Sequence, residues 1–157
     1  QSDERKHIKL LVKQGIFGSK ITKIISLAKN KGIEVEMVPA KNFDSKHSYK
    51  SQGVVLFAGK RKFFSMKNLL KNARDNNEVP FILLLDRIQD VHNLGAIIRT
   101  ASAMGVHGIV IPKHRSAQIT SEVERISQGT VNRLLVCNST NLKNEIDYLK
   151  KEVRTFY

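Results

Sequence analysis

Polar and charged side chains gather in one stretch, residues 85–101, that otherwise has the pattern of a buried strand followed by a helix. Asn93, Gly95 and Arg99 stand in its second half. An arginine on a small, apolar helix needs an anionic partner, and its planar guanidinium suits a phosphate or a carboxylate. In open parallel sheets, ligands bind where strands end and helices begin. The stretch therefore predicts a site for an anionic ligand, with Asn93 and Arg99 as its candidate residues.

A structural interpretation of the same residues also has to be weighed. Asn93 is well placed as a helix N-cap, and Gly95 removes a side chain where another backbone or a ligand could come close. Arg99 could bridge to a nearby carboxylate. Local spacing alone favours this interpretation, and only the wider sequence pattern reverses the preference.

The neighbouring sequence predicts the elements that would position these residues. Apolar runs predict strands, and apolar residues at helical spacing predict helices. The expected order is strand 81–85, helix 94–104, strand 108–111, helix 120–128, strand 134–136 and helix 142–151. Thr120 or Ser121 can cap the second of these helices. Strands that alternate with helices predict a parallel sheet covered on both faces.

The first part of the chain predicts a separate small α/β unit. Its expected order is strand 8–12, a glycine turn at 15–18, a helix through Ala28, strand 33–38, a polar stretch at 41–52 and strand 54–58. The turn could offer backbone amides to a phosphate, but an ordinary turn is the preferred interpretation. A segment rich in Lys, Arg and Asn follows, with a short helical pattern at 66–73. We therefore expect domains at 1–60 and 80–157, joined by a basic connector at 61–79.

The charge balance favours a polyanionic partner. Lys and Arg total 27 against 14 Asp and Glu in 157 residues, a formal net charge of +13. Nucleic acid is the natural partner of such a chain, although an AT-rich genome that inflates Lys remains an alternative. The candidate phosphate contacts form two clusters: Lys60, Arg61 and Lys62, and Lys113, His114 and Arg115. Each cluster taken alone is more typical of a solvated surface.

The composition excludes several classes of protein. Cys137 is the only cysteine, so neither a disulfide framework nor a cysteine-based zinc site can form within the chain. The five histidines are scattered, and we expect no metal. No apolar run approaches the roughly 20 residues of a membrane span, residues 1–7 lack the pattern of a secretion signal, and no Gly-x-Gly-x-x-Gly turn indicates a dinucleotide-dependent oxidoreductase. We expect a cytoplasmic protein without membrane contact, and an organelle stays open.

The motif around Asn93 is similar to a known family signature. It runs Asn93-Leu94-Gly95-Ala96-x-x-Arg99-x-Ala101-x-Ala103-x-Gly105-Val106, then Ile111-Pro112 and Ser116-Ala117. This order resembles the first signature motif of the SpoU family of RNA ribose 2'-O-methyltransferases, in the SPOUT superfamily, and it is far more specific than a lone glycine motif. Residues 51–55, Ser-Gln-Gly-Val-Val, resemble the end of that family's N-terminal RNA-binding domain, with Ser51 where histidine is usual.

The resemblance implies the fold class and the chemistry. It implies a small α/β RNA-binding domain, similar to ribosomal proteins, followed by the N-terminal part of a parallel-sheet α/β SPOUT methyltransferase domain. It also implies S-adenosylmethionine as cofactor and RNA as partner, so that the basic clusters become an RNA footprint. In the family, the arginine matching Arg99 is held to act on the ribose 2'-hydroxyl, and the asparagine matching Asn93 supports the geometry. Because a guanidinium ordinarily stays protonated, Arg99 could instead clamp the RNA phosphate.

The chain also departs from the family pattern. It stops at Tyr157, before the family's Gly-x-Glu and Ser-Leu-Asn-x-Ser motifs, which form most of the cofactor pocket and the C-terminal knot. Gly129 stands at a family-like position, but Asn132 replaces a glutamate often found after it. We therefore expect the cofactor pocket mostly beyond Tyr157 and the chain alone to be inactive. The full-length protein is expected to be a homodimer that methylates a guanosine of large-subunit ribosomal RNA, with a tRNA-directed 2'-O-methyltransferase and a non-catalytic RNA-binding protein as alternatives.

Overall fold

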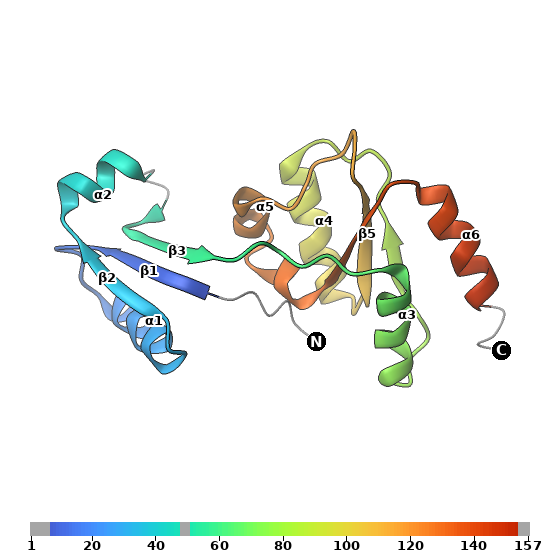
Figure 1. Cartoon of the computed structure of the whole chain (residues 1–157), viewed down its shortest axis with the longest axis horizontal. Helices are drawn as coiled ribbons and strands as arrows, with labels where there is room; N and C mark the ends of the chain where they lie inside the picture. Colours follow the sequence, from blue (N-terminus) through green and yellow to red (C-terminus); the bar gives the residue numbers. More distant parts are fainter. Residues whose placement is uncertain (1–6, 48–50, 154–157) are drawn as a thin grey trace. The chain divides into compact units, whose positions relative to one another are not determined.

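The computed structural model of the chain describes residues 7–47 and 51–153. Contacts divide the described residues into two compact units, one within residues 5–61 and one within residues 62–157. We call them the N-terminal unit and the C-terminal unit and describe each by itself (Figure 1).

The N-terminal unit is a three-stranded mixed sheet with two helices. Its elements are β1 (His7–Lys13), α1 (Ser19–Asn30), β2 (Glu34–Val38), α2 (Ala40–Lys46) and β3 (Val54–Ala58). The strand order is β2-β1-β3, with β1 parallel to β2 and antiparallel to β3. The polar stretch 41–52, to which the sequence analysis assigns no element, contains α2. Phe43 accounts for this helix. It is only 1% exposed, so one buried aromatic side chain stabilises a helical turn that is otherwise polar.

The N-terminal unit has a small core. Leu10 and Val12 of β1 pack with Ala28 of α1, and these three are the buried residues of the cluster. Successive side chains of a strand point to opposite faces, so the neighbours of Leu10 and Val12 face away from α1. On α1, Ile24 and Leu27 are 38% and 51% exposed. The apolar residues of α1 are therefore only partly buried, and some of them face solvent.

The C-terminal unit is built around a parallel sheet, as the sequence predicts. Its elements are α3 (Met66–Asp75), β4 (Ile82–Leu84), α4 (Val91–Ala103), β5 (Gly108–Pro112), α5 (Ser121–Ile126), the short 3-10 helix η2 (Thr130–Arg133), β6 (Leu135–Ser139) and α6 (Leu142–Val153). The strand order is β4-β5-β6, and both pairs are parallel. Thr120 caps α5, as expected, by accepting the Val123 N–H at 3.3 Å.

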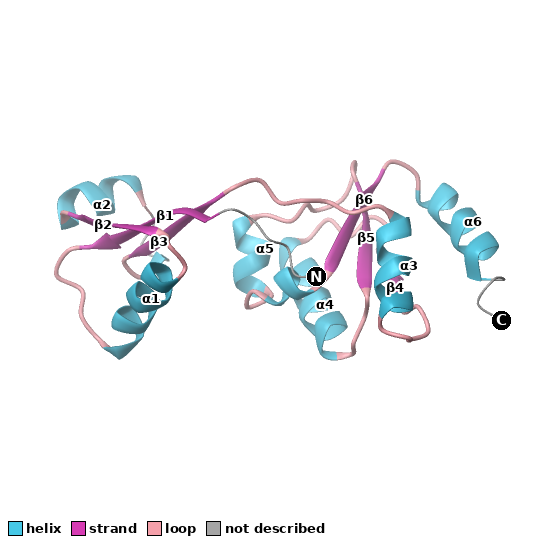
Figure 2. Ribbon diagram, turned by 60° about the horizontal axis from the view of Figure 1, so that its bottom comes forward, coloured by secondary structure: helices cyan, strands magenta, loops and turns pink. Residues whose placement is uncertain are grey.

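Helices cover both faces of this sheet. Ile109 and Ile111 of β5 belong to a core cluster with Leu94 and Ile98 of α4. Val110, between them, belongs to a second cluster formed with residues of α3 and α6. Figure 2 shows α4 and α5 on one side of β5 and β6, and α3 and α6 on the other. The continuous apolar run of β5 thus reflects a strand buried on both faces.

The segment expected to be a connector, 61–79, contributes to this packing. The α3 residues Met66, Leu69, Leu70 and Ala73 are buried. A Cβ on Gly108 would lie 2.5 Å from Leu69 Cγ, so the glycine makes room for α3 against β5. The Phe64 N–H donates to the Val136 carbonyl at 2.9 Å and extends the sheet beside β6. Much of the segment is therefore a folded part of the C-terminal unit, whereas the domain boundaries themselves stay a prediction.

Candidate active site and nucleic-acid interface

The N-cap of α4 is Asp90. The Asn93 N–H donates to Asp90 Oδ1 at 2.7 Å, and the helix begins at Val91. The prediction of Asn93 as the cap is wrong, because an aspartate three residues earlier accepts this otherwise unpaired N–H, as N-cap aspartates do. Asn93 lies instead in the first turn with an exposed side chain. Its carboxamide is therefore not needed to start the helix.

Arg99 lies on the exposed part of α4. The helix buries Leu94, Gly95, Ile98 and Ala101, while Arg99 remains in contact with solvent. Within residues 7–47 and 51–153, the Arg99 guanidinium forms no hydrogen bond and no ion pair. The carboxylate bridge considered from the sequence is thus not formed with a described residue, and the guanidinium is available to a ligand.

Asn93 and Arg99 do not form a pair by themselves. Six residues of a regular helix span about 9 Å and place the second side chain about 120° around the axis from the first. Both side chains are exposed. They can therefore act together only through a ligand that spans the first half of α4.

Gly95 lets α5 approach α4 closely. A Cβ at this position would lie 2.5 Å from Ile126 Cγ2 and 3.4 Å from the Ser127 backbone nitrogen. Real Cβ atoms do not approach other atoms so closely, so any larger residue would push α5 away. The glycine of the motif therefore serves helix packing, which in turn fixes the face of α4 that carries Arg99.

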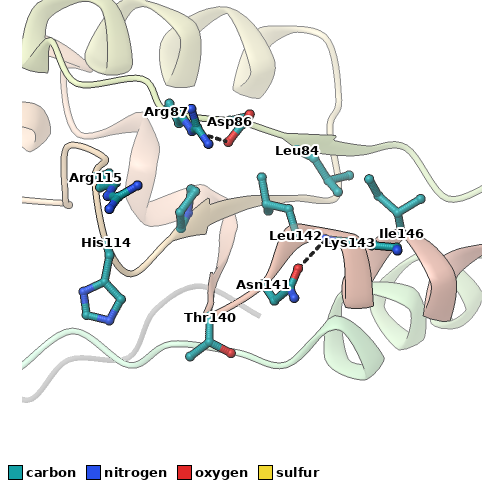
Figure 3. A pocket seen from close by; sticks show the side chains of 11 residues that line it. Leu84, Asp86, Arg87, His114, Arg115, Thr140, Asn141, Leu142, Lys143 and Ile146 are labelled. Carbon is teal, nitrogen blue, oxygen red and sulfur yellow. Dashed lines mark hydrogen bonds and ion pairs between the residues drawn. The ribbon is translucent and has the colours of Figure 1, made fainter.

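A basic pocket of about 500 Å³ lies where β4 and β5 end and α6 begins. Its ionisable lining residues are Asp86, Arg87, His114, Arg115 and Lys143. Figure 3 shows the arginine and histidine side chains toward one end of the pocket and the apolar side chains of Leu84, Leu142 and Ile146 toward the other. The carboxyl edge of the sheet therefore offers a positively charged hollow with an apolar wall.

The pocket and the α4 motif lie on different faces of the sheet. Leu84 and Leu142, which line the pocket, pack in the cluster of α3 and α6. The α4 residues Leu94 and Ile98 pack in the other cluster. Asn93 and Arg99 do not line the pocket. The two candidate groups of residues thus flank one sheet edge from two sides.

Hydrogen bonds hold the loop that carries Lys113, His114 and Arg115. Gln118 Nε2 donates to the Pro112 carbonyl at 2.8 Å and to the Ser116 carbonyl at 3.1 Å, which closes the loop. Asn138 Nδ2 donates to Gln118 Oε1 at 3.2 Å and ties the loop to β6. Arg115 has a φ of 56°, a left-handed conformation that is uncommon for such a residue. The loop is therefore held in one shape without a ligand.

The predicted basic cluster at residues 60–62 is divided between the two units. Lys60 and Arg61 belong to the N-terminal unit, and Lys62 belongs to the C-terminal unit. Lys60 and Lys62 are exposed, and Arg61 is partly buried. Lys62 Nζ lies 5.5 Å from the centre of the Phe64 ring, within the range of a cation–π contact. These three residues stay predicted RNA contacts.

Metal and thiol chemistry find no support in the described part of the chain. No group of three or more His, Cys, Asp or Glu side chains there could hold a metal ion. Cys137 is buried, and this burial, with the charge of Glu145 second, raises the pKa of its thiol to about 11. A protonated thiol is a poor nucleophile. Across residues 7–47 and 51–153, no helix combines the length and apolar character of a membrane span.

Two family models match successive parts of the chain. The model of the SpoU rRNA Methylase family matches residues 80–157, and the model described as RNA 2'-O ribose methyltransferase substrate binding matches residues 1–64. The chain belongs to the SpoU methylase family. The resemblance inferred from the motif at Asn93 and Arg99 is thereby confirmed at the level of the family.

Curated relatives of this chain are longer than the chain itself. A putative TrmH family tRNA/rRNA methyltransferase, YacO, of Bacillus subtilis (strain 168) is 38% identical over 148 residues, which cover 94% of this chain and 59% of the relative. A putative TrmH family tRNA/rRNA methyltransferase of Staphylococcus aureus (strain MSSA476) is 36% identical over 142 residues, with 90% and 57% covered. The chain thus spans less than two thirds of these SpoU proteins.

Solved structures of SpoU methyltransferases share the fold. The SpoU methyltransferase AviRb of Streptomyces viridochromogenes, in complex with the cofactor AdoMet, matches with a TM-score of 0.70 at 16% identity, over 97% of this chain and 54% of that one. An AdoMet-bound rRNA methyltransferase of Sinorhizobium meliloti matches with a TM-score of 0.63 at 21% identity, over 94% and 52%. These likenesses confirm the mixed α/β architecture with a parallel sheet.

Two basic residues of the pocket in this SpoU chain, Arg87 and Lys143, are not among the site residues predicted from the sequence. Arg87 follows β4 and Lys143 stands in the first turn of α6, so only the parallel order of the strands brings them beside His114 and Arg115. One local signal was present, because Arg87 lies in the polar stretch after the apolar run of β4. Lys143 gives no such signal, since lysines are common on exposed helix surfaces.

Proposed function

We propose that this chain forms part of an S-adenosylmethionine-dependent RNA methyltransferase that modifies ribose 2'-hydroxyls. The observation that carries the proposal is the order of the two family matches, substrate binding at 1–64 and methylase at 80–157. The exposed guanidinium of Arg99, on the signature motif, supports it. RNA supplies the anion that this guanidinium otherwise lacks among the described residues.

Arg99 is the residue that we assign to the reacting ribose. The 2'-hydroxyl is a weak acid, so its deprotonation limits the reaction at neutral pH. Because a guanidinium keeps its protons in proteins, we favour a role in which Arg99 clamps the neighbouring phosphate bidentately and orients the hydroxyl. Asn93, about 9 Å away along the helix, would contact the nucleotide from the start of α4. The alternative, in which Arg99 assists proton removal directly, predicts the same loss of turnover.

The pocket at the sheet edge does not by itself fit the cofactor. S-adenosylmethionine supplies an activated methyl group on a positively charged sulfur. The pocket at the sheet edge holds the cations of Arg87, Arg115 and Lys143 against one carboxylate, Asp86, and such a surface disfavours a cation. We therefore assign no cofactor contact to these residues and expect the cofactor pocket mostly beyond Tyr157. Without that part, this chain should not bind the cofactor with useful affinity.

The same charge surplus suits RNA. We assign Arg87 and Lys143 to the RNA interface, together with the predicted contacts Lys113, His114 and Arg115. All of these except Lys113 line the pocket, which lies at the edge where α/β proteins bind ligands. The loop that carries Lys113, His114 and Arg115 is held by Gln118 in advance. A positioned cation loses less conformational entropy on binding than a mobile one. We expect a homodimer for the full-length protein, which would place two such surfaces on one assembly.

The RNA substrate we propose is a guanosine of large-subunit ribosomal RNA. The printed names of the two relatives leave both tRNA and rRNA open, so the experiment must examine both. Ribose methylation is mapped by mass spectrometry in ribosomal and transfer RNA from cells with and without the full-length gene. Loss of one ribosomal 2'-O-methyl group supports the proposal, loss of one in tRNA corrects the substrate, and an unchanged map contradicts methyl transfer and leaves a non-catalytic RNA-binding protein.

A further inference from the structure

Phe17 is the most exposed of the large apolar side chains in the described part of the chain, at 91%. It stands in the turn between β1 and α1, between Gly15 with a φ of 83° and Gly18 with a φ of 136°. These are conformations that glycine adopts readily and other residues rarely do. The turn therefore holds an aromatic ring in solvent, although burial would stabilise it, and the family motif around Arg99 does not explain this ring.

Phe17 borders a hollow that also contains the segment similar to the family's RNA-binding domain. The hollow has a volume of about 520 Å³, and Lys20, Ile24, Ser51 and Gln52 are among its lining residues. Two segments more than 25 residues apart thus meet here. Gln52 is exposed and has a φ of 52°, so its carboxamide is presented from a turn rather than from a regular element.

Packing holds the two segments together. The Lys13 N–H donates to the Gly53 carbonyl at 2.8 Å. A Cβ on Gly53 would lie 2.8 Å from Ile16 Cδ1, so a larger residue there would displace the Ile16 side chain from its contact with this segment. Gly53 also has a φ of 79°, which glycine tolerates. The positions of the Phe17 and Gln52 backbones are therefore fixed before any ligand binds.

The charge of the N-terminal unit indicates what the hollow binds. Residues 5–61 carry 13 Lys or Arg and three Asp or Glu, and α1 carries no acidic residue. A polyanion with flat apolar groups complements this surface. An unpaired base in structured RNA has a face that stacks on an aromatic ring, an edge that hydrogen-bonds a carboxamide, and a phosphate beside it. A fully paired duplex hides the base faces and would leave Phe17 without a partner.

We propose that Phe17 stacks on an unpaired base of structured RNA, that the Gln52 carboxamide bonds the edge of this base, and that Lys20 contacts a neighbouring phosphate. The inference rests on the proposed function, because it names how the N-terminal unit holds the RNA of that enzyme. It differs from the interface at the sheet edge, which lies in the other unit and has no Phe or Tyr among its lining residues.

The test compares two RNA hairpins, one with a single bulged adenosine and one fully paired, bound to the full-length protein and followed by fluorescence anisotropy. Phe17→Leu should weaken binding of the bulged hairpin about 5- to 150-fold, the range of one lost base–aromatic stack. The paired hairpin should bind unchanged. Phe17→Tyr keeps the ring and should keep the affinity. Phe81→Leu removes a ring that is 44% exposed in the other unit and is the matched control.

A second variant tests the carboxamide. Gln52→Gly removes it while accepting the φ of 52° without strain, so a folding defect is not expected. Hairpins bulged with each of the four bases should bind wild-type protein unequally and the variant more equally. Equal discrimination by both proteins would remove Gln52 from the proposal.

The outcomes separate this inference from the proposed function. If Phe17→Leu leaves both hairpin affinities unchanged, or weakens both equally, the stacking site is refuted. If it leaves RNA binding intact but releases a co-purifying protein, the surface is a protein interface and the inference also fails. Methyl transfer to total RNA is measured in parallel with the wild-type protein, and its absence would overturn the proposed enzyme without affecting the result for Phe17.

Discussion

The two units differ most in how their charges are balanced. Residues 5–61 carry 13 basic and three acidic residues, whereas residues 62–157 carry 14 basic and nine acidic residues. Most of the positive charge surplus therefore lies in the shorter unit. Attraction to a polyanion grows with uncompensated charge. On the proposed function, this difference in charge assigns the capture of RNA mainly to the N-terminal unit and a local RNA contact surface to the C-terminal unit.

The two units also differ in packing, because the less charge-balanced N-terminal unit has the smaller core. The C-terminal unit buries two clusters on opposite faces of a parallel sheet. The N-terminal cluster has three buried residues, and this unit leaves Ile8, Phe17 and Met37 exposed at 57%, 91% and 47%. A well-packed sheet holds residues at its edge in fixed positions, which catalysis requires. We therefore infer a division of roles: the N-terminal unit provides exposed surface for binding, and the C-terminal unit holds residues in fixed positions.

The largest effect that tests this division is expected at Arg99. Arg99→Ala in the full-length protein should lower the turnover of methyl transfer roughly 100- to 10,000-fold, because orientation and charge stabilisation at the ribose are lost. RNA affinity should change little, since the N-terminal unit retains its charge. Single-turnover kinetics and a binding titration measure the two quantities. Arg133→Ala, which removes another exposed arginine of the C-terminal unit, is the control.

The opposite result at Arg99 would contradict the proposed division of roles between the two units. A variant that loses RNA affinity in proportion to turnover would make Arg99 an anchor, and capture would then be shared between the units. Retained turnover would remove Arg99 from the reaction. Arg99→Lys keeps the charge and loses the planar fork, so a loss as large as that of alanine would show that a positive charge alone is not sufficient.

The next effect concerns the rigidity of the C-terminal unit. Gly95→Leu places a side chain where Ile126 Cγ2 lies 2.5 Å from the added Cβ, and such overpacking costs about 1–3 kcal/mol. Urea unfolding and hydrogen exchange measure the loss, which should concentrate in α4 and α5. Ala96→Leu adds the same side chain at the next, exposed position and should be close to neutral. Equal losses in both variants would contradict the packing role of Gly95.

The sequence was sufficient for elements whose signal is local. The alternation at 8–12 predicted β1, the apolar run at 54–58 predicted β3, and the cap at Thr120 predicted α5. The start of α4 was placed three residues late, at Leu94 rather than Val91, because Asp90 supplies the cap before the apolar pattern begins. The helix α2 was missed because one buried side chain, Phe43, holds it in a polar stretch.

The site was predictable only in part, for a physical reason. The α4 motif is continuous in sequence, so its residues could be singled out together. The basic pocket depends on which strand ends become neighbours, and Arg87 and Lys143 are brought together only by the order β4-β5-β6. The hollow beside Phe17 depends likewise on the close contact of Gly53 with Ile16. Such contacts join residues that are far apart in the chain, so they could not be inferred from the spacing of residues in the sequence.

A smaller effect tests the local RNA surface of the C-terminal unit. The double variant Lys113→Gln and Arg115→Gln should reduce the slope of log affinity against log salt by about 1.4 to 1.8, because each phosphate contact contributes about 0.7 to 0.9. Lys150→Gln with Lys151→Gln removes the same charge from the end of α6 and should leave the slope unchanged. Equal changes in both double variants would mean a diffuse surface and would weaken the contrast between the units.

The smallest effect concerns Cys137, in the core between β6 and α3. Its folded pKa, raised to about 11 from 9.0, means that the fold favours the protonated thiol. Its contribution to stability is therefore fully present below pH 9 and is lost between pH 9 and about 11, as the unfolded thiol ionises first. The stability difference between wild type and Cys137→Ala should shrink over this interval in urea unfolding at stepped pH. The N-terminal unit has no cysteine, so thiol alkylation of the native chain at pH 8 reports on the C-terminal core alone. Rapid labelling of Cys137 would show that this core opens more readily than its packing indicates.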